Sequence, residues 1–456
     1  MQMKTFLTHI FIVCCLLMAI SCGEDRTYEY EEKTQHNHWV FSEMKDKYLW
    51  GDSLKEFEPA WKSFFAKPSE FLPKVTAKSK QGDSWSYVEV DTLIEDSHQR
   101  GYFHHVNSYG LDFVLMNDPT GQTTKQVLRV MTVYPNSPAE RAGLLRNDFI
   151  CSYNSQKFTS NNLTKLQSGV TRTLEVRHIT HEELEGRIEW LDTVTVQLPA
   201  SEYVEDEAFP ISTICLAEGK RIGYLMCTRL VEYPIETGSP RGASPVYRDD
   251  LDRIMSDIRQ SHIDELVLDL RLCNFGTMEM AQRLASYVVC PECLGSTFVK
   301  TYWNDRYTEN NQTIPYDMSV ANLGLNRIYI LTSSYTQGAA EWLIHALQHS
   351  MGEERVILIG KATKGQNVMT QEVGDNFHVH LFPVVAYVAD GSGNYEYGSL
   401  SPAIKVVETE YITLADYGDP DEILFNTAVQ HILGLRQIDS EPVEESDKKA
   451  EEEQEE

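Results

Sequence analysis

Hydroxyl and amine side chains occur close together in two short stretches of the C-terminal half of the chain. Residues 331–342 read LTSSYTQGAAEW and include Ser334 and Thr336, and residues 359–368 read IGKATKGQNV and include Lys364. A hydroxyl that gives its proton to a lysine of lowered pKa can act as a nucleophile in acyl transfer. These residue types make a Ser/Lys hydrolase the first chemistry to consider.

The two stretches resemble the nucleophile and base motifs of the C-terminal-processing (tail-specific) serine peptidases. In that family a Thr/Ser-Ala-Ser-Ala-Ser-Glu turn opens a helix, and a Thr-x-Gly-Lys loop supplies the base. Aligned on this pattern, Gly338 stands at the position of the nucleophilic serine and Gln366 at the position of the lysine. Glycine has no heteroatom and glutamine is neutral, so neither side chain can perform its part of the reaction. The resemblance therefore implies a family member without catalytic activity.

A third motif of the family also departs from its usual sequence. The family has Asp-Leu-Arg-x-Asn-Gly-Gly after a core strand, and the glycine amides are thought to form the oxyanion hole. Here Asp269-Leu-Arg271 is kept, but Leu-Cys-Asn-Phe-Gly follows, so that Asn274 and Phe275 replace glycines. A loop that relies on glycine conformations must then take another path. We expect a third defect at this loop, with the Phe275 ring inside the pocket.

Two alternatives to a non-catalytic binding protein stay open. Ser334 or Thr336 could work with Lys364 as a shifted dyad of an active serine-type endopeptidase, which requires both partners within about 3 Å. Alternatively, the chain could be a structural component of an envelope complex. We expect no metal and no cofactor, because no His/Cys/Asp cluster has metal-ligand spacing.

A further part of the sequence resembles the two signature segments of a bacterial PDZ domain. The segment Gly110-Leu111-Asp112-Phe113 resembles the loop whose amides capture the terminal carboxylate of a peptide. Residues 137–143 resemble the short helix that lines the groove. Asn147 stands where the motif has glycine, and asparagine tolerates a left-handed conformation. The resemblance implies peptides or protein C-termini as partners.

The resemblance covers most of the chain, and it implies an α/β (mixed α+β multidomain) fold. Asn37 is expected to cap a helix that runs to Trp50. In the C-terminal half, apolar strands alternate with helical patterns, which indicates an α/β core. The predicted divisions are a signal peptide (1–22), a tether and helical N-terminal domain (23–100), a PDZ-like domain (101–200), a tail-specific-peptidase core (201–436) and an acidic tail (437–456).

The N-terminus is typical of an exported protein. Lys4 precedes an apolar stretch that is too short for a comfortable membrane span, and residues 19–22 read AISC, similar to a bacterial lipobox. The resemblance implies that Cys22 is lipidated and anchors the protein in the cell envelope, at the periplasmic face or the cell surface. A plain cleaved signal peptide is the alternative.

Composition limits the remaining partners and the cysteine chemistry. The formal net charge of -28 argues against nucleic acid and against contact of the folded surface with anionic lipid, so that a lipid at Cys22 is the one membrane contact expected. The acidic run near the C-terminus is too polar to bury a core and is expected to be disordered. Cys290 and Cys293 form the one close pair, which is compatible with a disulfide. The other four cysteines beyond residue 22 lie in or beside apolar runs, and we expect buried thiols there.

Overall fold

The computed structural model describes residues 27–78, 82–90, 107–121, 125–159, 162–182, 187–204, 207–233, 246–376 and 379–437. The chain divides into two compact units, Met1–Leu93 with Thr370–Val385, and Ile94–Met369 with Ala386–Glu456. The predicted signal peptide, Cys22, the boundary at residue 100 and all but the first residue of the acidic tail lie outside the described residues.

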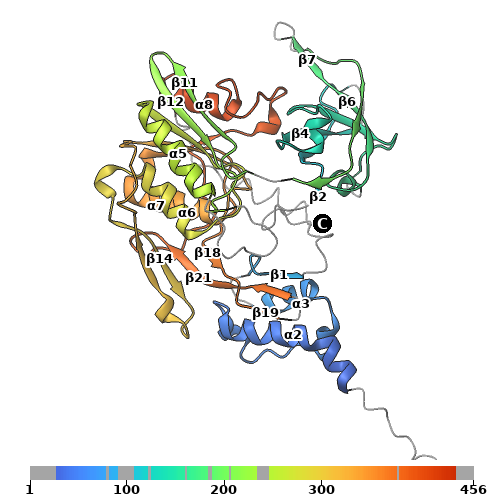
Figure 1. Ribbon diagram of the computed structural model, residues 1–456, viewed down its shortest axis with the longest axis vertical. Helices are drawn as coiled ribbons and strands as arrows, with labels where there is room; N and C mark the ends of the chain where they lie inside the picture. The colour runs from blue at the N-terminus through green and yellow to red at the C-terminus, as the bar shows by residue number, and fades with distance from the viewer. Residues whose placement is uncertain are drawn as a thin grey trace, which may run out of the picture. The chain divides into compact units, whose positions relative to one another are not determined.

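The first unit combines helices with a small antiparallel sheet of order β1-β20-β19 (Figure 1). Its elements are α2 (Thr27–Lys47), η1 (Gly51–Leu54), η2 (Trp61–Phe65), α3 (Pro68–Thr76), β1 (Tyr87–Val90), β19 (Asp375–Asn376) and β20 (Val379–Phe382). Because β20 pairs with β1, residues 370–385 belong to this unit, although the sequence analysis assigned them to the core.

Asn37 does not begin the N-terminal helix, and that prediction was wrong. Helix α2 begins earlier, at Thr27, and Asn37 lies inside it with a buried side chain. Its Nδ2 donates to the carbonyls of Phe64 at 3.0 Å and Ala66 at 2.7 Å. A buried amide needs such hydrogen-bond partners. Asn37 therefore makes a tertiary contact between α2 and η2 and does not cap a helix.

The second unit contains the PDZ-like domain, an antiparallel sheet of order β3-β4-β5-β6-β9. The strands of this sheet are β3 (Leu111–Asn117), β4 (Gln126–Val133), β5 (Phe149–Tyr153), β6 (Arg172–Arg177) and β9 (Val194–Leu198). Two pairs lie beside it, β2 (Asn107–Ser108) with β10 (Glu202–Tyr203), and β7 (Ile179–Glu182) with β8 (Arg187–Trp190). The helix α4 (Pro138–Arg141) is short. Asn147 has a left-handed φ of 75°, which confirms the prediction for that turn.

The α/β core is a six-stranded sheet of order β11-β12-β13-β16-β17-β22. Its strands are β11 (Ile211–Ala217), β12 (Lys220–Met226), β13 (Glu265–Asp269), β16 (Ile328–Thr332), β17 (Val356–Gly360) and β22 (Ile404–Lys405). Only β11 is antiparallel to its neighbour. Parallel strands need crossover connections, which here contain the helices α5 (Val246–Gln260), α6 (Met278–Val288) and α7 (Ala339–Met351).

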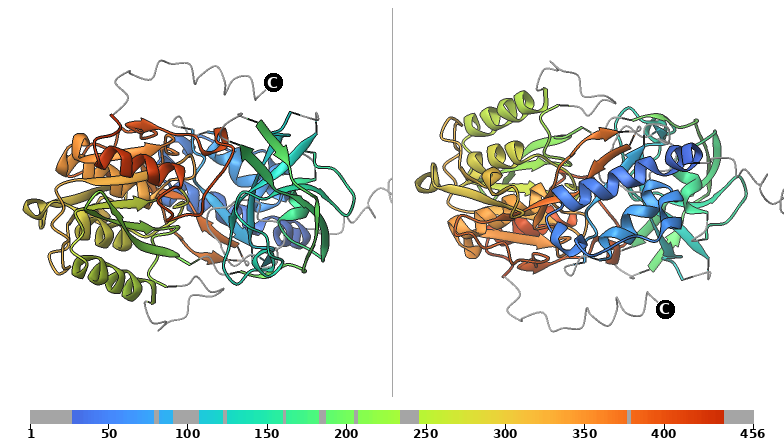
Figure 2. Two further views of the ribbon diagram at one scale, coloured as in Figure 1. Left: turned by 90° about the horizontal axis from the view of Figure 1, so that it is seen from above. Right: turned by 90° about the horizontal axis from the view of Figure 1, so that it is seen from below.

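Helices cover both faces of the core sheet (Figure 2). Alternate residues of the core strands pack on opposite faces. Leu266 and Leu268 of β13 pack with α5, α6 and α7 in one hydrophobic cluster. Val267 packs on the other face with α8 (Ile423–Ile432). The prediction of a mixed α+β multidomain fold is thus confirmed.

A second sheet, of order β15-β14-β21-β18, completes the core strands. It is formed by β14 (Thr297–Trp303), β15 (Gln312–Pro315), β18 (Val368–Thr370) and β21 (Val384–Ala389). Short 3-10 turns lie at η3 (Leu163–Leu166), η4 (Pro291–Cys293), η5 (Thr308–Asn310), η6 (Glu353–Arg355) and η7 (Glu408–Glu410). Within the described ranges, no helix is long and apolar enough to span a membrane.

The cysteines of the described residues form one disulfide and leave four thiols outside it. Cys290 and Cys293 are bonded to each other across the short turn η4, which precedes β14. Cys227 and Cys273 are buried thiols, as predicted, whereas Cys151 and Cys215 are half-buried.

Candidate functional site

The three sequence motifs converge at one edge of the α/β sheet. The strands β13, β16 and β17 are parallel neighbours, so their carboxyl ends lie at the same edge. Residues 270–277, 333–338 and 361–367 follow these strand ends. In open α/β sheets, ligands commonly bind outside the carboxyl ends of the strands. The fold therefore brings the candidate positions together at a place suited to a site.

Gly338 lies where the chain turns from β16 into α7. It has φ 60° and ψ -120°, a conformation that favours glycine. A Cβ built on Gly338 would lie 3.2 Å from Oε1 of Gln366 and 3.8 Å from its Nε2. The two positions identified by resemblance thus face each other across the site, and neither carries a reacting group.

Gln366 is buried and held in place by several contacts. Its Nε2 donates to the carbonyl of Val368 at 3.2 Å, and the main-chain carbonyl of Gln366 accepts from Nε1 of Trp342 at 3.1 Å. The amide side chain has no basic nitrogen, so it cannot remove a proton from a hydroxyl. It fills the position of a base without performing its role.

Glu341 connects the two loops of the site, and it was not among the site residues predicted from the sequence. Its buried carboxylate accepts from the hydroxyl of Thr363 at 2.5 Å and from the amides of Gly365 at 2.6 Å, Gln366 at 2.7 Å and Gly338 at 3.2 Å. Burial raises the pKa of Glu341, and these hydrogen bonds oppose the rise. A glutamate three residues into a helix is a capping signal, so its contact with the Gly338 amide was predictable. Its contacts with the loop after β17 were not.

The loop after β13 is braced by Gln337 rather than shaped by glycines. The amide of Gln337 donates to the carbonyl of Cys273 at 3.1 Å, and its Nε2 donates to the carbonyl of Asn274 at 2.9 Å. Phe275 is half-buried and packs against the large hydrophobic cluster, and its carbonyl accepts from Leu230. Among the described residues, the buried Oδ1 of Asn274 has no hydrogen-bond partner. Gln337 thus holds the carbonyls of Cys273 and Asn274, and Asn274 and Phe275 bring side chains to positions where the family has glycines.

The structure does not join the rescue candidates into a dyad. The buried Thr336 hydroxyl donates to the carbonyl of Leu270 at 2.9 Å and accepts from the amide of Ser333 at 3.0 Å. Ser334 and Lys364 are both exposed. Within the part of the chain that is described, the Lys364 ammonium makes no hydrogen bond or ion pair. A shifted Ser/Thr-Lys pair has no geometric support here.

A buried ion cluster fixes the retained Asp269-Leu-Arg271 segment. The Arg271 guanidinium donates to Asp269 at 2.9 Å, to Glu422 at 2.7 and 2.8 Å and to Glu408 at 2.9 Å. Burial raises the pKa of Asp269 despite Arg271, whereas for Glu422 the attraction of Arg271 overcomes burial and lowers the pKa. Arg146 of the PDZ-like domain also reaches Glu408, at 2.6 Å. Such a fully partnered cluster holds its loop in one arrangement.

The predicted carboxylate loop lies at the start of the PDZ edge strand β3. Gly110 has a left-handed φ of 71°, but its amide donates to the hydroxyl of Ser108 at 2.8 Å. Leu111, Asp112 and Phe113 lie in β3 opposite β4, and in an antiparallel pair alternate residues direct their amides away from the partner strand. Because β3 pairs only with β4 among the described strands, its other edge can accept an extended peptide.

The helix predicted to line the groove contacts the segment that leads into the carboxylate loop. In α4, Pro138 and Ala139 are buried, and the amide of Ala139 donates to the carbonyl of Tyr109 at 2.9 Å. The start of α4 is thereby joined to the residue before Gly110. The amide of Tyr109 donates to the carbonyl of Gln167, so the residue just after η3 contacts the same segment.

Comparisons with known proteins agree with this architecture. The family model for peptidase family S41 matches residues 221–397. The model for the peptidase S41 N-terminal domain matches residues 35–87, and a PDZ domain model matches residues 129–168. These features define a C-terminal-processing peptidase fold with a PDZ domain. The chain belongs to peptidase family S41.

Solved structures show the same fold. A protein from Bacteroides fragilis assigned to the S41 proteases is 27% identical, with a TM-score of 0.75 over 88% of this chain and 98% of its own. A CPAF mutant is 10% identical, with a TM-score of 0.50 over 91% of this chain and 99% of its own, and is similar in fold alone. A search of curated proteins returned no match.

Proposed function

We propose that this S41 family member does not cleave peptide bonds and instead binds peptides or unfolded protein segments in the cell envelope. One observation carries the proposal: the side-chain position of Gly338 points at Gln366, and the pair offers neither a nucleophile nor a base. Loss of one member of a catalytic unit can reduce the rate by a factor of about 10⁶.

The loop after β13 supports the same proposal. Asn274 and Phe275 replace the glycines whose amides are thought to stabilise the oxyanion in the family. The two rival functions have less support. A shifted dyad would need Thr336 to leave two hydrogen bonds, and a purely structural role leaves the free edge of β3 unexplained.

PDZ domains in general bind peptides or C-termini, and this supports the binding part of the proposal. The free edge of β3 would pair with the peptide main chain, while amides of residues 111–113 would face the terminal carboxylate. Localisation in the envelope as a lipoprotein rests on the sequence around Cys22.

The test of inactivity uses the purified full chain with an unfolded protein and with a peptide that ends in an apolar residue. We expect no cleavage above the background of a mock purification. As controls, Ser334→Ala, Thr336→Ala and Lys364→Ala should behave as the wild type does. Cleavage that survives further purification and is lost in one of these variants would show an active shifted dyad and end the proposal.

A further inference from the structure

Strand β11 is an outer strand of the six-stranded sheet, yet it lacks the usual protection of an edge. Its sequence, ISTICLA, has no charged residue and no proline. Natural sheets protect their edges with short strands, charges or prolines, because a bare edge pairs with other chains. The opposite edge strand, β22, has two residues and carries Lys405. The unprotected edge at β11 is therefore a feature that needs a partner.

The hydrogen-bonding groups of β11 alternate between β12 and the open side. A two-residue turn joins Ala217 to Lys220, which makes them a hydrogen-bonded pair. The N–H and C=O groups of Ser212, Ile214 and Leu216 consequently point away from β12. Within the described ranges, β12 is the only strand that pairs with β11. Three residues thus present unpaired main-chain groups in one row.

The same three residues place their side chains on the face of the sheet that carries α5. The neighbouring Cys215 and Ala217 pack instead against the cluster that contains α8. Ile214 is 37% exposed and Leu216 is 76% exposed. Ile214 and Leu216 thus expose apolar surface beside the outward-facing main-chain groups of the strand.

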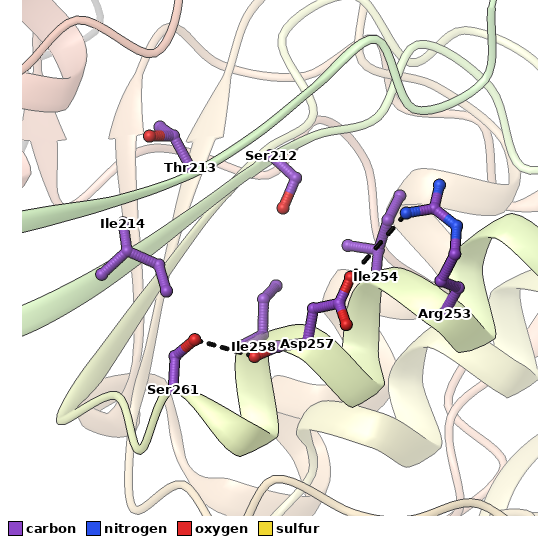
Figure 3. A pocket seen from close by; sticks show the side chains of 8 residues that line it. All are labelled: Ser212, Thr213, Ile214, Arg253, Ile254, Asp257, Ile258 and Ser261. Carbon is purple, nitrogen blue, oxygen red and sulfur yellow. Dashed lines mark hydrogen bonds and ion pairs between the residues drawn. The ribbon is translucent and has the colours of Figure 1, made fainter.

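An open pocket of about 360 Å³ lies between the free strand and α5 (Figure 3). Its lining includes Ser212 and Ile214 of β11 and Arg253 and Asp257 of α5. On its rim, Arg253 lies 3.2 Å from Asp250 and 3.8 Å from Asp257. The rim carries charges of both signs, so an identical rim can approach it without strong repulsion.

We propose that β11 is a self-association strand that pairs antiparallel with β11 of a second copy of this chain, about a two-fold axis at Ile214. This register places Ser212 opposite Leu216 of the second copy and Ile214 opposite itself. The three outward-facing residues of each strand then form about six main-chain hydrogen bonds. The six-stranded sheets of the two copies join into one continuous sheet.

The strand and the pocket rim fit a second copy as the occupant. Each chain has a formal net charge of -28, which opposes association over most of the surface, so two copies can meet only where charge is absent or balanced. The seven residues of β11 form a strip without charge where the copies can meet. A two-fold contact also requires a patch that is complementary to itself. Two copies of β11 that run antiparallel meet this condition, because each copy presents the same residues to the other.

The experiment measures the mass of the full chain in a mild detergent by sedimentation velocity, at about micromolar concentration. The wild type should be a dimer. Ile214→Lys and Ile214→Glu should each be at least tenfold weaker dimers, because the two-fold axis sets like charges directly against each other. Mixing the two variants should restore a dimer, since lysine then faces glutamate. Met318→Lys, at a residue that is exposed outside β11, is the matched control and should stay dimeric.

Several outcomes would overturn the inference. These are a monomeric wild type, a dimer that survives either charged variant, or two variants that do not associate when mixed. The mixed sample also guards against misfolding, because a variant that failed to fold could not regain a dimer. A monomer that bound an unrelated extended peptide at β11 would assign the edge to another partner and reject self-association.

Discussion

Gly338 is held in a backbone conformation that residues with a side chain adopt at a cost. At φ 60° and ψ -120°, a side chain would add strain of about 1 to 3 kcal/mol. Its Cβ would also press on Oε1 of Gln366 at 3.2 Å. The conformation suits a strained turn at the start of a helix, and glycine occupies it without strain.

Restoring both side chains should not restore a peptidase. In Gly338→Ser with Gln366→Lys, Asn274 and Phe275 still shape the loop after β13, and loss of one oxyanion donor alone can reduce the rate about 10² to 10³-fold. The measurement is kcat/KM on a peptide with an apolar C-terminus, with Gly338→Ser alone as the control. Turnover comparable to that of an active family member would show that the loop is not a third defect.

At the scale of elements, the strand pair β1 and β20 holds an acidic side chain that titrates unusually. Burial raises the pKa of Glu89 to about 8, and among its neighbours His380 opposes the rise and Glu372 adds to it. Glu89 lies directly across from His380 in the sheet register. The folded chain therefore retains a proton on Glu89 that the unfolded chain releases above a pH of about 4.5.

Stability should therefore fall as the pH rises from about 4.5 to about 8. The contribution of Glu89 is complete below that window and is lost as the folded carboxyl ionises. We expect a loss of about 1 to 2 kcal/mol, reduced by solvent because Glu89 is half-buried. Glu89→Gln should remove this part of the pH dependence in thermal unfolding of the full chain, whereas Glu70→Gln on the exposed side of α3 should not. Equal pH profiles for wild type and Glu89→Gln would contradict the assignment.

The edge strand β3 and the loop before it make a prediction about ligand chemistry. A peptide with an apolar last residue and a free carboxylate should bind weakly, because the amides of residues 111–113 favour a negative charge. Amidating the peptide terminus should abolish measurable binding in a calorimetric titration. A scrambled peptide with a free carboxylate is the control for non-specific charge. Equal affinity for the amidated peptide would favour a packing role for the PDZ domain.

At the scale of the whole molecule, the N-terminal sequence predicts how the chain is held in the envelope. Acyl chains gain about 0.8 kcal/mol per buried CH₂, and two or more anchor a protein stably. Wild type should fractionate with membranes and carry lipid mass on Cys22, whereas Cys22→Ala should not carry that mass. The measurement is fractionation with intact mass of the mature N-terminus. A soluble wild type that begins at or after Gly23 without lipid would reject the anchor.

The sequence by itself predicted which reacting groups are absent. Gly338 and Gln366 were located by their resemblance to the nucleophile and base motifs of the family, and side-chain identity decides whether a hydroxyl or an amine is present. The α/β class also followed from local alternation, because apolar strands and amphipathic helices have different periods. The left-handed turn at Asn147 is similarly a property of a few neighbouring residues.

Only the tertiary structure decided how distant groups are used. The bond from Asn37 to η2, the pairing of β20 with β1 and the contact of α4 with Tyr109 all join residues far apart in sequence. The same holds for Glu341, whose carboxylate joins α7 to the loop after β17. A buried polar group takes whichever partners the fold brings to it, and local sequence does not specify those partners.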